Sequence, residues 1–584
     1  MVRALKKHQP PVIFPRFQGV KMRVVREHIA AYLFLFPAAA LLFVFNVFPV
    51  LFSLFVSLHE WSIFPEIYNG LENYEKALGD FAFVLFFWLA FGLFWLSYRI
   101  FRNFLRSAQS WPDRFHSLLP ASLFSLATIS LCYWFLLSLP LVVDSPRRLP
   151  PGRHSAAVFI HEFLHSFRFP EVVRAGNIAL ILTFIAIAAN LYWWRNRYRQ
   201  VSRHFGQATL FLWTFAAAFW LIWMTYHELV AAVGRATSRL PIWGALLTMA
   251  QTFAELRLPL PATPPIYELP IWSQLIFISA GAMLVFAAYR LWQRAHRSLD
   301  DRAFYGQILA AILFLLGGYL LIVRMPVALQ EADDDLLRGF GITAMFSLGT
   351  VPVQLSVGLV LAYLLFQNIR GKEFFRLVYF LPYIMPFAAT AVVFKVLFGQ
   401  AQNSTLNNLM KFLGLGAQKW LQEPTGIFQL LFGSGVPEIL AGPSLALVVI
   451  MIYTSWTYIG FDTVVFLAGL GNIPSELYEA ARIDGASGWR IFRHITLPLL
   501  SPTTFFLSLI AIIGTFQAFT QLWIMRTPAS SRAVDTASIY MFETIRNTRP
   551  QYGYGAAMAF VLFIIILLLT LAQNQLAGRR VFYG

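Results

Sequence analysis

The chain contains about twelve long apolar runs, and this repetition limits its fold more strongly than any other feature. A helix that crosses a bilayer needs about 20 predominantly apolar residues, which each run supplies. The runs are continuous rather than alternating, and only helices satisfy their own backbone hydrogen bonds inside lipid, so strands are not expected. The sequence therefore predicts an all-α polytopic membrane protein with about twelve transmembrane helices. Their centres lie near Leu42, Leu89, Leu131, Phe184, Ala217, Gly281, Leu315, Leu355, Ala388, Val449, Ile512 and Ile564.

The composition agrees with the bilayer as the surrounding medium. Charged residues make up 12% of the chain and hydrophobic residues 58%, whereas a soluble domain carries about 25% charge. The formal net charge of +17 could indicate a nucleic-acid partner. However, Lys and Arg occur in short clusters between the apolar runs, and no basic face or nucleic-acid motif is present. We therefore expect the lipid bilayer as a partner and no nucleic acid.

The clusters of Lys and Arg also predict how the chain is oriented, because cytoplasmic loops carry an excess of these residues. Clusters precede the first run, follow the second, fourth, sixth and eighth runs, and close the chain. This alternation places both termini in the cytoplasm and the protein in the cytoplasmic membrane. One loop disagrees, because it is predicted to lie outside yet contains Arg147, Arg148, Arg153, Arg168 and Arg174. The clusters that agree include Arg3, Lys6 and Lys7; Arg99, Arg102 and Arg106; Arg195, Arg197 and Arg199; Arg290, Arg294 and Arg297; Arg370, Lys372 and Arg376; and Arg579 and Arg580.

A polar segment at residues 473–498, between the tenth and eleventh runs, predicts two short helices. Pro474 suits a first helical turn, and Gly485 suits a helix stop. Leu477, Ala480, Ala481 and Asp484 follow at i, i+3, i+4 and i+7, which gives the first helix one face of mostly small residues with a single acid. Such a face allows close approach to a groove on another protein. The second helix would stack Ile491 on Ile495.

This segment resembles a known family. Its order is Glu479-Ala480-Ala481, three residues, Gly485, nine residues, Ile495, one residue, then Leu497-Pro498. It is similar to the EAA loop of binding-protein-dependent ABC importer permeases, in the maltose-type carbohydrate branch. Segments 27–61, 335–400 and 552–573 look like other helices of the same core. The resemblance assigns contact with the ATPase to Glu479, Ala480, Ala481, Asp484 and Gly485.

The resemblance is interrupted, which predicts the domain organisation. We expect a basic cytoplasmic N-terminus at 1–28, a first core helix with its outer loop at 29–80, and an inserted, membrane-embedded region of about six helices at 81–330. The remaining five core helices, with the EAA coupling loop at 473–498, occupy 331–584. Six helices would thus form a type I ABC importer core. An even number of inserted spans keeps the EAA loop cytoplasmic, but the insertion resembles nothing with a known role.

The resemblance implies a permease subunit that moves a sugar or sugar derivative across the cytoplasmic membrane. Its implied partners are a second permease subunit, two ATPase subunits and an extracellular sugar-binding protein. No G-x-x-x-x-G-K-[ST] phosphate loop occurs in the chain. We therefore expect this chain not to be an enzyme and to bind no cofactor itself, with ATP and Mg²⁺ on the partner ATPase subunits.

Polar residues within core spans are candidates for the substrate path, because such groups are costly in lipid unless they face a cavity. The candidates are Thr454, Trp456, Tyr458, Thr515 and Gln517. By the resemblance, Thr454, Tyr458 and Thr515 lie at or near positions that line the sugar site of the maltose permease, although the family has amides where this chain has Thr. A role in packing helices together stays open for each of the five.

Two alternative functions remain. His161-Glu162-Phe163-Leu164-His165 spells H-E-x-x-H, which on a helix places two His on one face for zinc and Glu as a base. A membrane metalloprotease would need a third protein ligand; candidates such as Glu171 exist, but no familiar downstream signature accompanies them. We favour an ordinary loop helix and assign no catalytic or metal-binding residue. The other alternative is a permease fused to an accessory interaction module formed by 81–330.

Overall fold

The computed structural model describes residues 22–108, 110–149, 156–236, 271–295, 302–367, 369–433 and 435–576. These residues are almost entirely helical, and their one sheet is the two-stranded hairpin of β1 (His59–Trp61) and β2 (Pro65–Tyr68). Several of the predicted basic positions lie outside the described residues: Arg3, Lys6, Lys7, Arg153, Arg297, Arg579 and Arg580.

The predicted number and positions of the spans are confirmed. Ten described helices are long and apolar enough to cross a membrane, and the number rises to twelve if each of two bent helix pairs counts as one span. Each predicted centre falls within one of these helices or bent pairs. The protein is therefore an all-α polytopic membrane protein.

The first of two compact units ends at Val56. It contains α1 (Met22–Leu42), the π-helical turn η1 (Phe43–Val47) and most of α2 (Phe48–Ser57). Residues Leu33–Ser57 form one candidate span, with a mean hydropathy of 2.4. A π-helical turn inside a helix adds a residue to that turn and shifts the later side chains around the axis.

The second unit, Ser57–Gly584, begins with the hairpin and α3 (Glu72–Leu78), followed by the helices of the predicted insertion. These are α4 (Phe81–Ser107), α5 (Trp111–Val143), η2 (Ser145–Arg148), α6 (Ala156–His165), η3 (Ser166–Arg168), α7 (Pro170–Ala236), α9 (Ile271–Ala295) and α10 (Arg302–Ala328). Helix α7 carries two candidate spans, so six spans lie between 81 and 328. Helix α7 packs against α4 and α5, and α9 packs against α10. A Cβ on Gly281 of α9 would lie 3.0 Å from the carbonyl oxygen of Gly317 of α10, so glycines let these two backbones meet closely.

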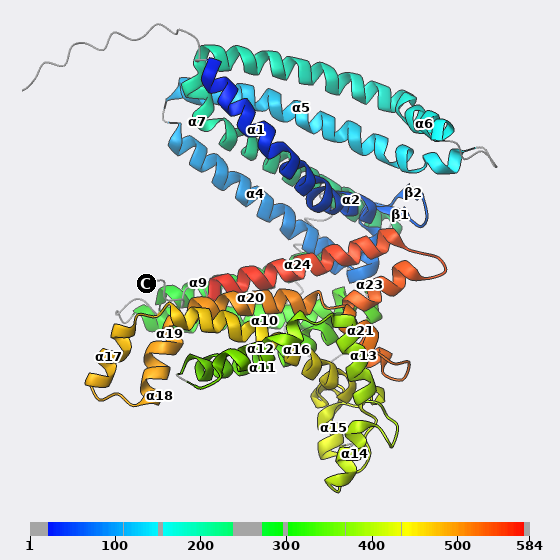
Figure 1. Ribbon diagram of the computed structural model, residues 1–584. Helices are drawn as coiled ribbons and strands as arrows, with labels where there is room; N and C mark the ends of the chain where they lie inside the picture. Colours follow the sequence, from blue (N-terminus) through cyan, green and yellow to red (C-terminus); the bar gives the residue numbers. More distant parts are fainter. Residues whose placement is uncertain are drawn as a thin grey trace, which may run out of the picture. The chain divides into compact units, whose positions relative to one another are not determined.

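The rest of the second unit contains the helices after residue 331, where five of the six core helices are predicted and which are called the core below (Figure 1). Helix α11 (Asp334–Phe366) packs along α16 (Leu445–Gly471), which is the most buried of the candidate spans. The other membrane helices are α12 (Lys372–Ile384), α13 (Phe387–Leu397), α20 (Ser501–Phe516) and α24 (Tyr552–Leu576). The connecting elements are α14 (Thr405–Phe412), η4 (Trp420–Gln422), α15 (Ile427–Phe432), η5 (Glu438–Leu440), α17 (Ser475–Ile483), α18 (Gly488–Ile491), η6 (Phe492–Thr496), α19 (Leu497–Leu499), α21 (Thr520–Met525), α22 (Ser531–Val534) and α23 (Ala537–Arg546). Figure 1 shows α17 and α18 at one end of this core and α23 at the other.

Two of the predicted spans are broken rather than continuous. Helices α12 and α13 meet at an angle of 95°. The break falls at Met385, which is extended (φ −67°, ψ 145°), because a residue before proline disfavours the helical conformation and Pro386 follows it. The segment Gly488–Leu499 meets α20 at 62°, beside Pro502 in the first turn of α20. Both breaks therefore coincide with prolines that could be seen in the sequence.

The two predicted ends of the insertion lie against each other. A Cβ on Gly79, whose φ is +59°, would lie 2.7 Å from the carbonyl oxygen of Ala328. The amide of Asp333 donates a hydrogen bond to the carbonyl oxygen of Lys76, at 3.1 Å. A segment of about 250 residues thus leaves the core and returns to it at one place. This is the geometry that an insertion between two core elements requires, although the boundaries themselves stay predictions.

Candidate functional site

The helix of the EAA-like segment begins and ends as its residues predict. Helix α17 starts directly after Pro474 and ends at Ile483. Gly485 has a φ of +76°, its amide donates to the carbonyl oxygen of Arg482 (3.1 Å), and the next amide, of Ala486, donates to that of Ala481 (2.9 Å). This pair of bonds is a Schellman motif, which satisfies the last carbonyl groups of the helix. A Cβ on Gly485 would meet no atom within 4 Å, so the left-handed backbone, not crowding, favours glycine.

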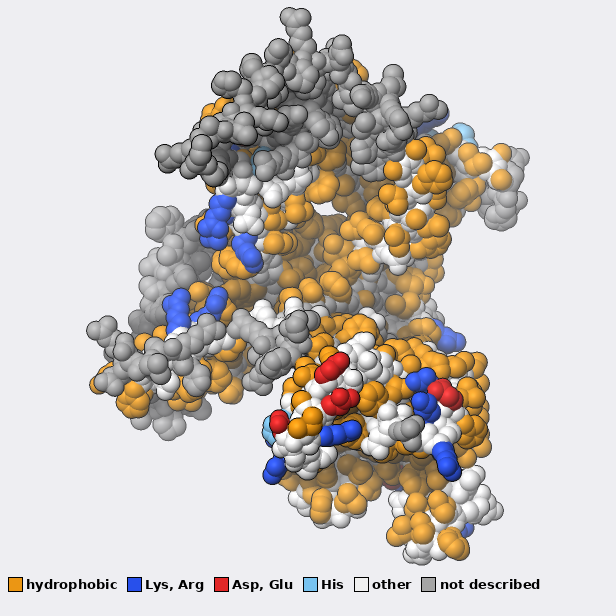
Figure 2. Space-filling model, turned by 60° about the vertical axis from the view of Figure 1, so that its left-hand side comes forward, with side chains coloured by type: hydrophobic (Ala, Val, Ile, Leu, Met, Phe, Trp, Pro, Cys, Tyr) orange, Lys and Arg blue, Asp and Glu red, His pale blue; other side chains and the backbone are white. Residues whose placement is uncertain are grey.

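The predicted small-residue face of α17 is divided in the structure. Ala481 is buried, whereas Leu477, Ala480 and Asp484 are exposed. Ile483 is 87% exposed, so it is the most prominent apolar side chain of the helix. The exposed surface of α17 is thus apolar along Leu477, Ala480 and Ile483. Acidic side chains lie beside this apolar surface. Figure 2 brings this end of the core forward and shows acidic and basic side chains on that end.

The inner side of this segment is fixed to the ends of the core helices. The hydroxyl groups of Tyr478 and Thr496 lie 3.3 Å apart, and the Tyr478 ring lies 6.5 Å from the ring of Phe366 on α11. The Phe492 ring packs edge to face on Tyr363 of α11, with centroids 4.9 Å apart. A buried apolar cluster continues the contact: Ala362, Phe466, Leu470, Ile473, Leu500 and Leu507. A force on α17 therefore acts directly on α11, α16 and α20.

The second predicted helix differs from expectation. Helix α18 is only four residues long, and the π-helical turn η6 (Phe492–Thr496) continues it. Ile491 is buried, but Ile495 lies inside the wider π turn and is only partly buried. The stacking expected from α-helical spacing does not apply across that turn, because the turn has more residues than an α-helical one.

Two of the predicted substrate-path residues have their hydroxyl groups occupied inside the chain. Thr454 is buried on α16 and donates to the carbonyl oxygen of Ile450, at 2.9 Å. Thr515 is buried on α20, and its hydroxyl lies 2.8 Å from that of Ser347 on α11. The Thr515 contact joins two helices, as expected of a packing residue, whereas the Thr454 hydroxyl bonds within its own helix.

The other three substrate-path residues are more accessible. Trp456 is 37% exposed, and its ring lies 5.0 Å from Phe394 on α13. The Tyr458 ring lies 5.9 Å from that of Tyr383 on α12, so Trp456 and Tyr458 both face the broken span. Gln517 is exposed directly after α20. The structure therefore brings Trp456 to α13 and Tyr458 to the α12–α13 break but does not join all five residues in one site.

Sequence reasoning missed a buried polar region between α11 and α16. Asp462 of α16 is 2% exposed, and its Oδ2 has no hydrogen-bond partner among the described residues. It lies opposite Gly358 of α11, where an added Cβ would come within 2.8 Å of the Asp462 Cβ. One and two turns earlier on α11, Gln354 and Thr350 are also buried, with Oε1 and Oγ1 unpartnered among the described residues. A lone acid inside an apolar run was the available signal, because ionisable residues within spans are rare and usually functional.

The H-E-x-x-H sequence lies on α6, where its side chains are used locally. The Nδ1 atom of His161 lies 3.5 Å from Glu162, and the His165 ring packs edge to face on Phe169. Among the described residues, no group of three or more His, Cys, Asp or Glu side chains could hold a metal ion. The described part of the chain therefore offers no third ligand to this pair.

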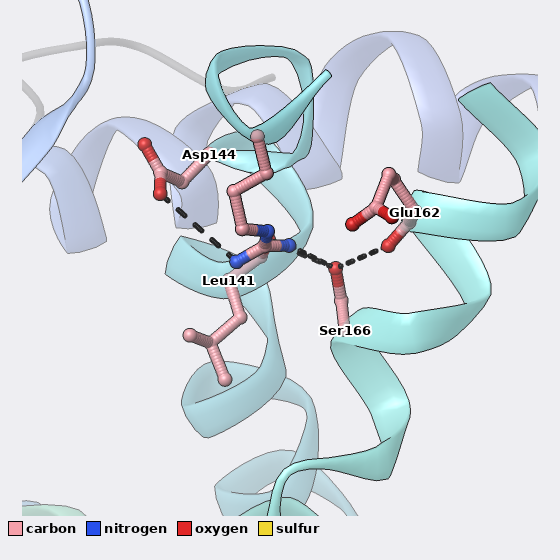
Figure 3. A network of polar contacts seen from close by, with 5 residues as sticks. Leu141, Asp144, Glu162 and Ser166 are labelled. Carbon is pink, nitrogen blue, oxygen red and sulfur yellow. Dashed lines mark hydrogen bonds and ion pairs between the residues drawn. The ribbon is translucent and has the colours of Figure 1, made fainter. Parts of the chain in front are cut away.

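The arginine-rich loop that disagrees with the charge pattern has a structural use for one of its arginines (Figure 3). The Arg148 guanidinium donates to the carbonyl oxygen of Leu141 (2.7 Å) and to the Ser166 hydroxyl (2.6 Å), and its other nitrogen lies 4.0 Å from Asp144. Ser166 also donates to the carbonyl oxygen of Glu162, at 3.2 Å. Arg148 thus joins the end of α5 to the turn after α6. This contact accounts for an arginine at position 148 even in a loop that the charge pattern predicts to lie outside.

Comparison with known proteins assigns the chain to a family. Residues 354–581 match the family described as "binding-protein-dependent transport system inner membrane component". Over 241 residues the chain is 32% identical to the arabinooligosaccharides transport system permease protein AraP of Bacillus subtilis (strain 168). That alignment covers 40% of this chain and 70% of the relative. The chain belongs to this family.

Other relatives transport related compounds. The chain is 28% identical over 241 residues to the lactose transport system permease protein LacF of Rhizobium radiobacter, covering 41% of this chain and 74% of that protein. It is 29% identical over 254 residues to the sn-glycerol-3-phosphate transport system permease protein UgpA of Agrobacterium fabrum (strain C58 / ATCC 33970), covering 43% and 79%. The protein is a permease component of a binding-protein-dependent transport system and a multi-pass protein of the cell membrane.

The chain can also be superposed loosely on a solved structure. The chain is 21% identical to a chain of a bacterial alginate ABC transporter crystallised with an alginate pentasaccharide-bound periplasmic protein. The superposition covers 50% of this permease and 98% of that chain, with a TM-score of 0.37. Such a loose superposition supports no comparison of sites.

Proposed function

We propose that this permease imports a sugar or sugar derivative and that the segment from α17 to η6 couples the movement of the core to ATP hydrolysis on a separate ATPase. The observation that carries the proposal is the construction of α17. It presents an exposed surface on one side, while Tyr478 and the neighbouring apolar cluster fix its other side to α11, α16 and α20.

This proposal assigns the α17 end of the core, with both termini, to the cytoplasm. The partners are a second permease subunit, two ATPase subunits that hold ATP and Mg²⁺, and an extracellular sugar-binding protein. The exposed Leu477, Ala480 and Ile483 would enter an apolar groove on the ATPase. Glu479 and Asp484, which are also exposed, would meet basic residues at its edge. Closure of the two ATPase subunits would then move α17 and the attached helix ends as rigid bodies.

For the substrate we propose a polyhydroxylated compound. The relatives are named for arabinooligosaccharides, lactose and sn-glycerol-3-phosphate, which all carry two or more hydroxyl groups on neighbouring carbons. The aromatic rings of Trp456 and Tyr458 beside the α12–α13 break suit the apolar faces of a sugar ring, and the exposed Gln517 amide can bond to its hydroxyl groups. Thr454 and Thr515 would act behind them as positioning residues, because their hydroxyl groups are already bonded, that of Thr454 within α16 and that of Thr515 to Ser347 on α11.

The test is reconstitution. The permease, its partner permease and the ATPase would be placed in vesicles, and ATP hydrolysis would be measured with and without the sugar-loaded binding protein. We expect hydrolysis to rise only with the loaded binding protein and labelled sugar to accumulate inside. A complex that assembles and hydrolyses ATP at the same rate in both conditions, without uptake, would contradict the proposal.

A further inference from the structure

Two carboxyl groups meet where the two ends of the predicted insertion lie against each other. Asp80 directly precedes α4, and Glu331 lies in the turn between α10 and α11. A Cβ on Gly79, the residue before Asp80, would lie 3.6 Å from the carbonyl carbon of Glu331, and the charge of Glu331 acts on the Asp80 carboxyl group. Asp80 is half-buried and its side chain makes no capping bond to α4, whereas Glu331 is exposed. The pair is therefore accessible from solvent.

Among the described residues, neither Asp80 nor Glu331 forms an ion pair with a basic side chain. The basic side chains of the adjoining segments contact other groups: Lys76 contacts Gln551, Arg324 contacts the Phe277 ring, and Arg338 contacts Asp335. Two carboxylates without a counter-charge repel each other, so a cation bound between them would stabilise this junction.

A third polar group, on α9, independently points to a ligand at the same place. Gln274 is only 7% exposed, and its amide group donates a hydrogen bond to Asp80. The Oε1 atom of Gln274 is buried and has no hydrogen-bond partner within the described part of the chain. Because both atoms belong to one amide group, this oxygen lies beside the Asp80 carboxyl group. A buried oxygen without a partner costs free energy, and a cation bound at the junction would supply that partner.

The junction lies at the end of the core opposite to α17. Asp333, two residues after Glu331, accepts a hydrogen bond from Tyr540 of α23 at 2.6 Å, and Figure 1 shows α23 and α17 at opposite ends. The proposed function assigns the α17 end to the cytoplasm, so the junction faces the outside; the inference rests on the proposed function for this point alone. Carboxylate and amide oxygens are ligands of Ca²⁺, which tolerates irregular coordination, whereas Mg²⁺ demands a nearly ideal octahedron.

We propose that Asp80, Glu331 and Gln274 bind one Ca²⁺ ion, which holds the two ends of the insertion together at the outer surface. Asp80 begins α4, Gln274 lies in the first turn of α9, and Glu331 follows α10, so one ion joins three segments of the chain. Only two acids take part, so water fills the remaining coordination positions. Few charged ligands give a weak site of the extracellular kind, which is half-saturated at about 0.1–1 mM Ca²⁺.

The experiment measures Ca²⁺ bound by the complete transporter complex and the Tm of that complex. The purified complex would be stripped with a chelator and titrated with radioactive Ca²⁺ at neutral pH and constant ionic strength. For the wild type we expect saturable binding and a Tm that rises by a few degrees in about 10 mM Ca²⁺. In Asp80→Asn/Glu331→Gln the affinity should fall about tenfold or more, and the rise in Tm should disappear. Gln274→Met, which keeps the length of the side chain without its oxygen, should lower the affinity about fivefold.

The matched control is Glu60→Gln/Glu72→Gln, which removes two exposed acids of β1 and α3 outside the site. Binding equal to wild type in this control supports a specific site. Equal binding by the wild type and Asp80→Asn/Glu331→Gln, or an equal loss in both double variants, would overturn the proposal. An equal rise in Tm with Mg²⁺, or with KCl at the same ionic strength, would also overturn it, because it would indicate general screening of charge.

If the double variant does not assemble, Glu331→Gln alone gives the same comparison, since that side chain is exposed. Neither Ca²⁺ binding nor the Tm depends on transport, so failure of this inference is distinct from failure of the proposed function.

Discussion

The two membrane-embedded parts of this permease, the helices of residues 81–328 and the helices after residue 331, differ in how deeply their most buried spans are enclosed. In the later part, α16 is 61% buried across its apolar window and carries the buried Asp462. In the earlier part, the windows of α5 and α10 are only 17% and 11% buried. The family match, at 354–581, lies entirely in the later part. A helix that mainly faces lipid needs only an apolar surface, whereas a helix inside a moving core needs particular residues at particular places.

This contrast is most sharply tested at Gly485, where the largest effect is expected. Gly485→Val forces a β-branched residue into a φ of +76°, at a cost of about 1–3 kcal/mol. We expect normal insertion but roughly a tenfold or greater loss of sugar-stimulated ATP hydrolysis in the reconstituted complex. The matched control is Gly488→Ala, because an added Cβ there meets no atom within 4 Å and the backbone has no positive φ. Full stimulation in Gly485→Val would mean that the end of α17 does not couple.

Whether a feature could be predicted from the sequence depends on the same distinction, between helices that face lipid and helices that pack inside the core. The spans could be predicted because a helix that crosses lipid needs a long apolar run. The helix stop at Gly485 could be predicted because only glycine adopts a positive φ at low cost. The α12–α13 break was not predicted, although Pro386 was visible, because proline is also tolerated within membrane helices. The inward position of Ala481 and the isolation of Asp462 depend on neighbours distant in the sequence. No local pattern specifies those contacts.

The contact of α11 with α16 gives the second largest effect, on stability. In Gly358→Ala the new methyl group would lie 2.8 Å from the Cβ of Asp462, so the two helices must separate. We expect a loss of about 1–3 kcal/mol, as for other overpacked interiors, measured by thermal unfolding of the purified complex. Gly341→Ala on the same helix meets nothing within 4 Å and should cause no loss. Equal stability of the two variants would show that α11 and α16 are not closely packed at Gly358.

The stability of the junction between the two parts, where Asp80 lies, should depend on pH. Burial, together with the nearby charge of Glu331, raises the pKa of Asp80 to about 6, although a hydrogen bond from Gln274 acts in the opposite direction. A raised carboxyl pKa means that the folded state favours the protonated form. Its stabilising contribution is therefore present below the ordinary pKa near 4 and is lost as pH rises through about 6.

We expect the Tm of the wild type to fall by a few degrees between pH 4.5 and pH 7 on this account, and Asp80→Asn to remove that part of the dependence. Asp113→Asn, at the start of α5 and away from this junction, serves as the control and should keep the wild-type slope. A Tm profile of Asp80→Asn that follows the wild type at every pH would contradict the role of Asp80.

The smallest effect is expected from the largest change, removal of residues 81–328. The ends can be rejoined without stretching the chain, because Gly79 already lies against Ala328 and the amide of Asp333 bonds to Lys76. Residues of α4 and α9 do pack on the core beside Tyr554 and Met558. Acyl chains are as apolar as the side chains that they would replace at these contacts, so sugar uptake should stay within about threefold of wild type. The removed part contains six candidate spans, and an even number leaves α17 on its original side of the membrane.

Removing only 81–203 deletes three spans, reverses the orientation of all later helices and should abolish uptake. If the six-span variant assembles with the ATPase but does not transport, the inserted helices take part in translocation. If it transports, neither they nor the His161 and His165 pair are needed for it.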